Sequence, residues 1–119
     1  MPELKKFTPV LRVKDLPAAL SFYRRLGFAI DFEHKFAENE KSHYAGLSRD
    51  GQSLHQSTFE ENGQTNTLVF ATVEDIDGLY KELTDADVTC RTPEDMSWGQ
   101  REMTVRDLDG NALRFAMPI

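Results

Sequence analysis

Few side chains in this 119-residue sequence can do chemistry, and they lie far apart along the chain. The three histidines, His34, His43 and His55, form no His-x-x-x-His or similar metal-binding motif. His55 follows Leu54 in a predicted strand, where an imidazole can act as a general base, contact a ligand or pack in the interior. A general base also needs an orienting partner, and the sequence identifies none. Cys90 is the only cysteine, and we interpret it as a small packing residue.

Charge and hydrophobicity exclude several classes of protein. Lys and Arg total 14 against 20 Asp and Glu, so the formal net charge is −6, which argues against a nucleic-acid partner. No apolar run approaches the roughly 20 residues that cross a bilayer. The first residues lack the apolar stretch of a secretory signal, and a single cysteine fits a reducing compartment, so we expect a cytoplasmic protein.

An internal repeat organises the chain. Val13-Lys14-Asp15-Leu16 recurs as Val73-Glu74-Asp75-Ile76, and Asp50-Gly51-x-x-Leu54 recurs as Asp109-Gly110-x-x-Leu113, both about 60 residues later. Two repeats in the same order at nearly the same offset indicate the duplication of one supersecondary unit. We expect one domain, 1–119, with module one at about 5–60 and module two at about 65–119.

Each module is predicted to run strand, helix and then three strands. In the first module Asp15 can cap a helix that Gly27 ends, because Asp accepts N-terminal amide hydrogens and Gly tolerates a left-handed backbone. The predicted strands are 7–13, 28–33, 42–48 and 53–58 in module one, and 67–73, a short strand near Val88, 102–106 and 112–117 in module two. The prediction is an α+β protein in which two βαβββ modules form a curved mixed sheet with helices on its outer face.

Several sequence runs carry a resemblance to a known family. They are Pro9-Val10-Leu11-Arg12-Val13-x-Asp15-Leu16, Ala19-Leu20-x-Phe22-Tyr23 with Leu26-Gly27-Phe28, and Trp98-Gly99-x-Arg101-Glu102 with Arg106-Asp107-x-Asp109-Gly110-Asn111. With these runs the whole chain resembles the vicinal oxygen chelate superfamily of glyoxalases, bleomycin resistance proteins and extradiol dioxygenases. Asp31-Phe32 and Ser53-Leu54-His55 are most similar to the bleomycin resistance branch.

The resemblance implies where a metal ion would be bound in the enzymes of this superfamily. The four positions fall here on Thr8, His55 (or Gln56), Leu68 and Arg114. A divalent ion needs several His, Asp or Glu donors, whereas Leu has no donor atom and Arg is a fixed cation. We therefore expect no metal, no other cofactor and no retained metal catalysis.

The resemblance also implies a binding groove at the interface of a homodimer. In bleomycin resistance proteins such a groove sequesters a large, planar, cationic glycopeptide, which needs aromatic faces and carboxylates. The ligand-binding residues that this implies are Asp31, Phe32, Phe36, His55, Ser57, Trp98 and Arg101. The expected partners are a small-molecule ligand, for which bleomycin is one candidate, and a second copy of the chain.

Plainer interpretations stay open at this point. Trp98 can line the groove or plug the end of the sheet, and Phe32 alternates with Ile30 as a core residue would. Other functional hypotheses are an enzyme with relocated metal ligands, using His55 with Gln56 or Glu102, and a structural dimer whose cavity is filled. The hinge at 60–64 allows the modules to pair within one chain or to be exchanged between two.

Overall fold

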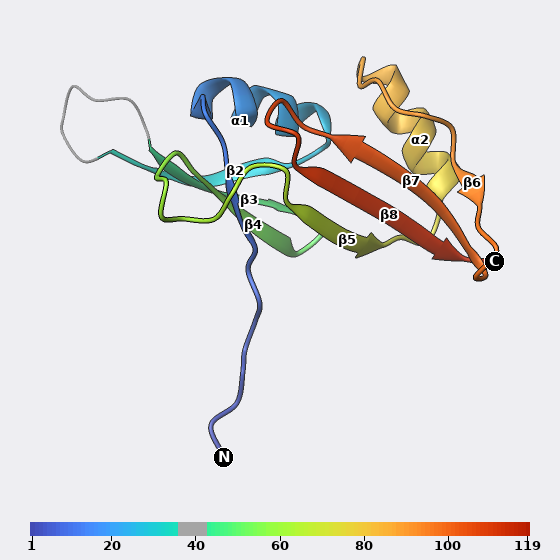
Figure 1. Ribbon diagram of the computed structural model, residues 1–119, viewed down its shortest axis with the longest axis horizontal. Coiled ribbons are helices and arrows are strands. Elements are labelled where there is room, and N and C mark those ends of the chain that lie inside the picture. The colour runs from blue at the N-terminus through green and yellow to red at the C-terminus, as the bar shows by residue number, and fades with distance from the viewer. Residues whose placement is uncertain (36–42) are drawn as a thin grey trace.

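A computed structural model describes residues 1–35 and 43–119, and it shows the predicted α+β architecture of two modules, each a four-stranded mixed sheet with one helix (Figure 1). Module one contains β1 (Val10–Arg12), α1 (Leu16–Arg25), β2 (Ala29–His34), β3 (Tyr44–Arg49) and β4 (Gln52–Ser57). Module two contains β5 (Leu68–Thr72), α2 (Ile76–Asp85), β6 (Glu94–Asp95), β7 (Gln100–Arg106) and β8 (Ala112–Pro118).

The two sheets have the same topology. Their strand orders are β1-β4-β3-β2 and β5-β8-β7-β6, so the last strand of each module lies beside the first. The first and last strands run parallel, and the other pairs are antiparallel. The duplication expected from the sequence therefore extends to the order and direction of every strand.

Local signals explain where both helices begin and where the first one ends. The Asp15 side chain accepts a hydrogen bond from the Ala18 amide at 3.2 Å, and the Asp75 side chain accepts one from the Gly78 amide at 2.9 Å. Each carboxylate satisfies an amide that the first turn of a helix leaves without a partner. After α1 the chain turns at Gly27, whose φ of 87° is unfavourable for other residues.

Two predicted strands differ from the structure. The short strand expected near Val88 is wrong: Val88 is buried, and its amide bonds to the Leu83 carbonyl as the chain leaves α2. The short strand is instead β6, which pairs with β7. The first strand, predicted over 7–13, contains only Val10–Arg12, and Phe7 before it is 85% exposed.

The Asp-Gly turns dock the modules on each other. The Tyr23 hydroxyl of α1 donates to Asp107 Oδ2 at 2.8 Å, just before the turn of module two. In the reciprocal contact Arg49, beside the turn of module one, donates to Glu82 of α2 at 2.8 and 3.1 Å. The turn of each module thus contacts the helix of the other, as expected for a pseudo-symmetric pair.

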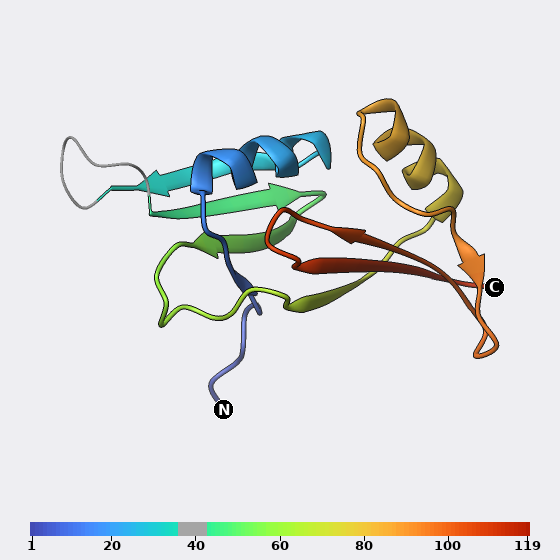
Figure 2. The same cartoon turned by 45° about the horizontal axis from the view of Figure 1, so that its top comes forward.

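Each sheet has one covered face and one open face. Figure 2 shows α1 and α2 on the same side of the molecule, with the strands below them. The buried apolar residues of both modules form one core cluster between helices and strands. The opposite faces keep large apolar side chains exposed, including Phe70 at 56% and Trp98 at 65%. No helix in the described ranges is long and apolar enough to cross a membrane.

Candidate functional site

An aromatic cluster lies on the open face of the first sheet. A register shift between Ile30 and Phe32 places Phe32 opposite Gly46, and its ring fills the space that a side chain at Gly46 would need. The Phe32 ring meets the His55 ring edge to face at a centroid distance of 5.2 Å and stacks with Tyr44 at 6.3 Å. Three neighbouring strands thus present one continuous aromatic surface.

The imidazole of His55 is held in one orientation by Tyr44. The Tyr44 hydroxyl and His55 Nδ1 are 2.7 Å apart and share a hydrogen bond. Partial burial lowers the pKa of His55, the nearby Lys6 ammonium lowers it further, and Asp31 opposes the shift. A pKa below the usual 6.5 keeps this ring neutral at pH 7, so His55 adds an uncharged polar group to the aromatic surface.

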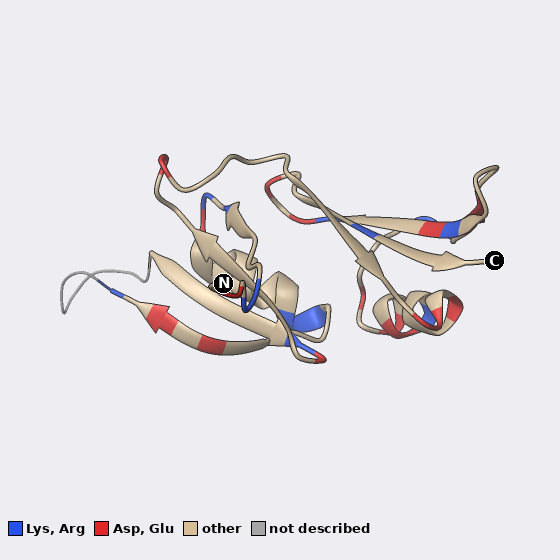
Figure 3. Cartoon of the chain, turned by 90° about the horizontal axis from the view of Figure 1, so that it is seen from below, with Lys and Arg blue, Asp and Glu red and all other residues tan. Residues whose placement is uncertain are grey.

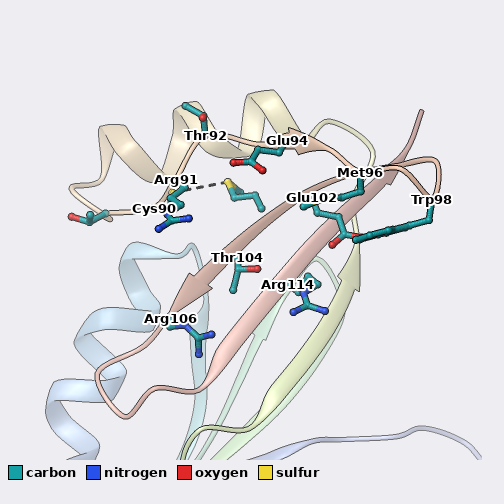
Figure 4. Close-up of a pocket in the computed structure, with 12 residues that line it drawn as sticks. Cys90, Arg91, Thr92, Glu94, Met96, Trp98, Glu102, Thr104, Arg106 and Arg114 are labelled. Atoms are coloured by element: carbon teal, nitrogen blue, oxygen red, sulfur yellow. Dashed lines mark hydrogen bonds between the residues drawn. The ribbon is translucent and has the colours of Figure 1, made fainter.

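A hollow of about 800 Å³ lies on the second module beside Trp98 (Figure 4). The Trp98 Nε1–H donates to Glu102 Oε2 at 2.8 Å, while the side chain remains 65% exposed. Glu102 itself is buried, so it anchors the indole from beneath. An indole that is fixed at its N–H and open on its ring is a ready surface for a flat ligand. This geometry favours a groove wall over a plug for Trp98.

The rest of the hollow combines polar and sulfur-containing side chains and carries three guanidinium groups. Its other lining residues are Thr89, Cys90, Arg91, Thr92, Glu94, Met96, Met103, Thr104, Arg106 and Arg114. Cys90 Sγ contacts Met103 Sδ at 4.0 Å, and burial raises the pKa of the thiol. A protonated thiol packed against methionine is a poor nucleophile, which agrees with its interpretation as a packing residue.

The structure brings together only some of the predicted ligand-binding residues. Phe32 and His55 are in contact on the first sheet, and Asp31 beside them accepts a hydrogen bond from Ser48 at 3.0 Å. Trp98 belongs to the hollow of module two, whose lining includes neither Phe32 nor His55. Within one chain the predicted residues therefore form two separate surfaces.

Two of the predicted residues, Ser57 and Arg101, make contacts with other parts of the protein. Ser57 is completely buried, and its Oγ accepts hydrogen bonds from the Phe59 amide and Asn62, so it holds the following loop and offers no surface to a ligand. Arg101 pairs with Asp77 and Asp95, at 2.9 Å each, and does not line the hollow. Phe36 lies outside the described residues.

The four positions of the implied metal site do not suit a divalent ion. His55 is on β4, whereas Arg114 is on β8 of the other sheet and adds a fixed positive charge. Gln56, the alternative to His55, points to the covered side of its sheet and is fully buried. Glu102 is held by Trp98 on the second sheet. In residues 1–35 and 43–119 no three His, Cys, Asp or Glu side chains come close enough to bind a metal.

The sequence did not predict that Thr104, Arg106 and Arg114 lie together in one hollow. Thr104 and Arg106 alternate with core residues along β7, which is a period-two signal that the sequence shows. Arg114 lies directly opposite Thr104 on β8, a relation that depends on strand register. Tyr44 lies near His55 for the same reason. The alternation was readable from the sequence, but the side-by-side placement was not.

Comparisons with known proteins agree with this architecture. A family model described as a glyoxalase superfamily protein matches residues 3–118. A bleomycin-binding protein from bleomycin-producing Streptomyces verticillus, solved with copper(II)-bleomycin, is 30% identical, covers 97% of each chain and has a TM-score of 0.75. A bleomycin-binding protein complexed with bleomycin is 21% identical over 98% of this chain and 100% of that one, with a TM-score of 0.78.

A further solved structure has the same fold and a different description. A glyoxalase-related enzyme from Clostridium phytofermentans is 21% identical over 99% of this chain and 98% of that one, with a TM-score of 0.81. No curated protein sequence matches the chain. The fold is therefore shared by ligand-binding proteins and by an enzyme-related protein, and the fold alone does not separate these functions.

Proposed function

The chain belongs to the glyoxalase superfamily, and from that premise we propose that it is a non-enzymatic protein that binds a flat small molecule in a groove between two copies of itself. The observation that carries the proposal is Trp98, whose indole is fixed by Glu102 and open on its face beside a hollow of about 800 Å³. Pockets for drug-sized ligands have about this volume and usually combine an aromatic wall with a few polar groups.

A homodimer supplies the second wall of the proposed groove. Leu68 and Phe70 on the edge strand β5 are 50% and 56% exposed, on the side away from α2. Apolar side chains of this size gathered on one face are typical of an interaction surface. A second copy that covers these open faces would bring the Trp98 hollow of one chain near the Phe32–Tyr44–His55 cluster of the other. The two separate surfaces would then form one site.

Bleomycin is the first ligand to test, because two of the similar proteins were solved with it or with its copper complex. The chain has a single tryptophan, so tryptophan fluorescence reports on Trp98 alone. We expect metal-free bleomycin to quench this fluorescence and to saturate at one ligand per groove. Calorimetry with Trp98→Phe, which keeps an aromatic ring but loses the bond to Glu102, should show weaker binding than the parent chain.

Light scattering tests the dimer independently of any ligand. We expect a mass of about twice the 13.6 kDa of one chain. A monomeric mass would show that the chain does not form the dimer on which the proposed groove depends. If a high concentration of bleomycin causes neither quenching nor heat, bleomycin is not the ligand of this protein. The proposal also places the protein in the cytoplasm, where a free Cys90 stays reduced, and cell fractionation checks this.

A further inference from the structure

The hollow beside Trp98 is electrically polarised along strand β7. Glu102, Thr104 and Arg106 follow one another on its open face, because alternate residues of a strand share a face. Figure 4 shows Trp98 and Glu102 together at one end of the hollow, with Arg106 and Arg114 nearer Thr104. Glu94 is directly opposite Glu102 in the register of β6 and β7, so both carboxylates lie nearer the Trp98 end of β7 than Arg106 does. Arg114 lies opposite Thr104 on β8, and Arg91 lies on the segment before β6.

Strand register places the guanidinium groups of Arg106 and Arg114 within reach of one ligand group. Thr104 pairs directly with Arg114, and Arg106 pairs with Ala112, so the two arginines are diagonal neighbours across β7 and β8. Diagonal neighbours on one face are about 7–8 Å apart at the backbone, a separation that two long side chains can close. The Thr104 hydroxyl lies between them as a further hydrogen-bond donor.

These arginines lack carboxylate partners in a chain that has an excess of carboxylates. Among the described residues Arg114 makes no ion pair, and Arg106 makes only a 3.3 Å hydrogen bond to the Gly110 carbonyl. By contrast Arg49 and Arg101, outside the hollow, each bind two carboxylates. Figure 3 shows acidic residues on α2 and also on strand β7, where Glu102 lines the hollow without pairing with either arginine. Two adjacent unpaired guanidinium groups on a half-covered surface repel each other unless an anion joins them.

We propose that the ligand of this protein carries a carboxylate or phosphate group that Arg106 and Arg114 bind, together with a flat ring that stacks on Trp98. The guanidinium fork matches the two oxygens of either anion. Trp98 is anchored at Glu102, so the ring and the anion are separated by about two to four strand residues, or roughly 7–14 Å. This inference rests on the proposed function and narrows its ligand class. A cationic tail, such as the one expected for bleomycin, would be repelled at the arginines and would have to lie toward the carboxylates of Glu94 and Glu102.

Calorimetry with three naphthalene probes of matched shape tests this inference. The probes are 4-(2-naphthyl)butanoate, the neutral 4-(2-naphthyl)butanamide and the cationic 4-(2-naphthyl)butylammonium, in which a flexible carbon chain lets the polar group reach the arginines while the ring stacks on Trp98. We expect the butanoate to bind about 10-fold or more tightly than the butanamide, and the cation to bind most weakly, because a hydrogen bond between two charged groups is stronger than one to a neutral amide. Raising NaCl from about 50 to about 500 mM should weaken only the binding of the butanoate.

Substitutions assign the effect to the two arginines. Arg114→Gln and Arg106→Gln should each reduce the affinity for the butanoate about 10-fold and leave the affinity for the butanamide unchanged, whereas Arg114→Lys should lose less affinity because it keeps the charge. Arg24→Gln, at an exposed position at the end of α1, is the matched control and should change neither affinity. Circular dichroism confirms that each variant is folded.

The outcomes separate this inference from the proposed function. Equal affinity for the butanoate and the butanamide would overturn the anion site and leave the Trp98 groove standing. A loss of butanoate binding in Arg24→Gln as large as in Arg114→Gln would do the same. If none of the three probes binds at about 10 mM, the small-molecule site at Trp98 fails together with the anion site.

Discussion

Replacing Tyr23 by Phe tests whether the two modules are docked as described. The Tyr23 hydroxyl is the one polar atom of a fully buried ring, and it donates to Asp107 Oδ2 across the interface between modules. Burial and then the Asp107 charge raise the pKa of Tyr23, so the phenol keeps its proton at every pH at which the protein is stable. The substitution removes one hydrogen bond and little volume.

The hydrogen bonds of Asp107 set the expected size of the effect. A hydrogen bond to a charged group is worth about 1.5–3 kcal/mol. Asp107 Oδ2 also accepts from Asn111 Nδ2 at 3.1 Å, and Oδ1 accepts from the Asp109 and Asn111 amides. The carboxylate therefore stays partly satisfied in the variant, which places the loss at about 1–2 kcal/mol. For a chain of this length that corresponds to a Tm lower by about 5 °C.

Urea unfolding followed by circular dichroism measures this loss. Tyr80→Phe is the matched control. Tyr80 is a partly buried tyrosine of α2, and its hydroxyl has no hydrogen-bond partner among the residues that the structure describes, so this substitution should change the free energy of unfolding by less than about 0.5 kcal/mol. Equal effects of the two substitutions would refute the docking contact. A Tyr23→Phe effect that grows on dilution would instead show that Tyr23 and Asp107 meet between two chains, with the modules exchanged.

Three further substitutions or titrations test individual features. Gly110→Ala should lower the free energy of unfolding by about 1 kcal/mol more than Gly51→Ala does. Both glycines have φ of 77°, but only a side chain at position 110 collides with Asn66. Equal losses in thermal unfolding would contradict this close approach. Gln56→Met should raise the free energy of unfolding by about 1 kcal/mol, because the buried Gln56 amide has no hydrogen-bond partner among described residues; a loss of stability in urea would contradict this. The NMR titration of the His55 ring should have its midpoint below pH 6.5. The unfolded chain then binds the proton more readily than the folded chain, so the stability of the parent chain relative to His55→Gln should fall as pH drops through 6.5. A titration midpoint above 6.5 would contradict the burial given as the cause of the lowered pKa.

Features that depend on short sequence segments were predictable. Asp15 and Gly27 bound the first helix by local rules of capping and backbone conformation, and both act as expected. The Asp-Gly repeats predicted two equivalent turns, and Gly51 and Gly110 share the same φ. The prediction of a strand near Val88 was wrong because the Val88 amide bonds to the end of α2 and its side chain packs in the core. Tertiary contacts of this kind leave no local signal in the sequence.

The candidate site was predictable only in part, for a related reason. Trp98 and His55 stand out by residue type, and each lies on an open face. Arg101 pairs with Asp95 across neighbouring strands, which charge alternation in the sequence can suggest, but its second ion pair is with Asp77 of α2, which is distant in sequence and left no signal. The placement of Arg114 opposite Thr104 requires the register of β7 against β8, which a single sequence does not specify.

The same residues that make the second sheet suitable for an anion make it unsuitable for metal chemistry. Arg114 stands at one of the positions where the resemblance implied a metal ligand, and a divalent ion there would meet a guanidinium that cannot lose its proton. Arginine is likewise unable to act as an acid or a base near neutral pH, and the raised pKa of the Cys90 thiol keeps it protonated. The side chains that could accept a proton in the hollow are the carboxylates of Glu94 and Glu102, and Glu102 already accepts the Trp98 Nε1–H. If His55 of a second copy completed the groove, it would add a neutral imidazole that can also transfer a proton. Comparing the parent chain with His55→Gln and with Glu102→Gln for turnover of bound ligand would therefore show whether either group catalyses a reaction.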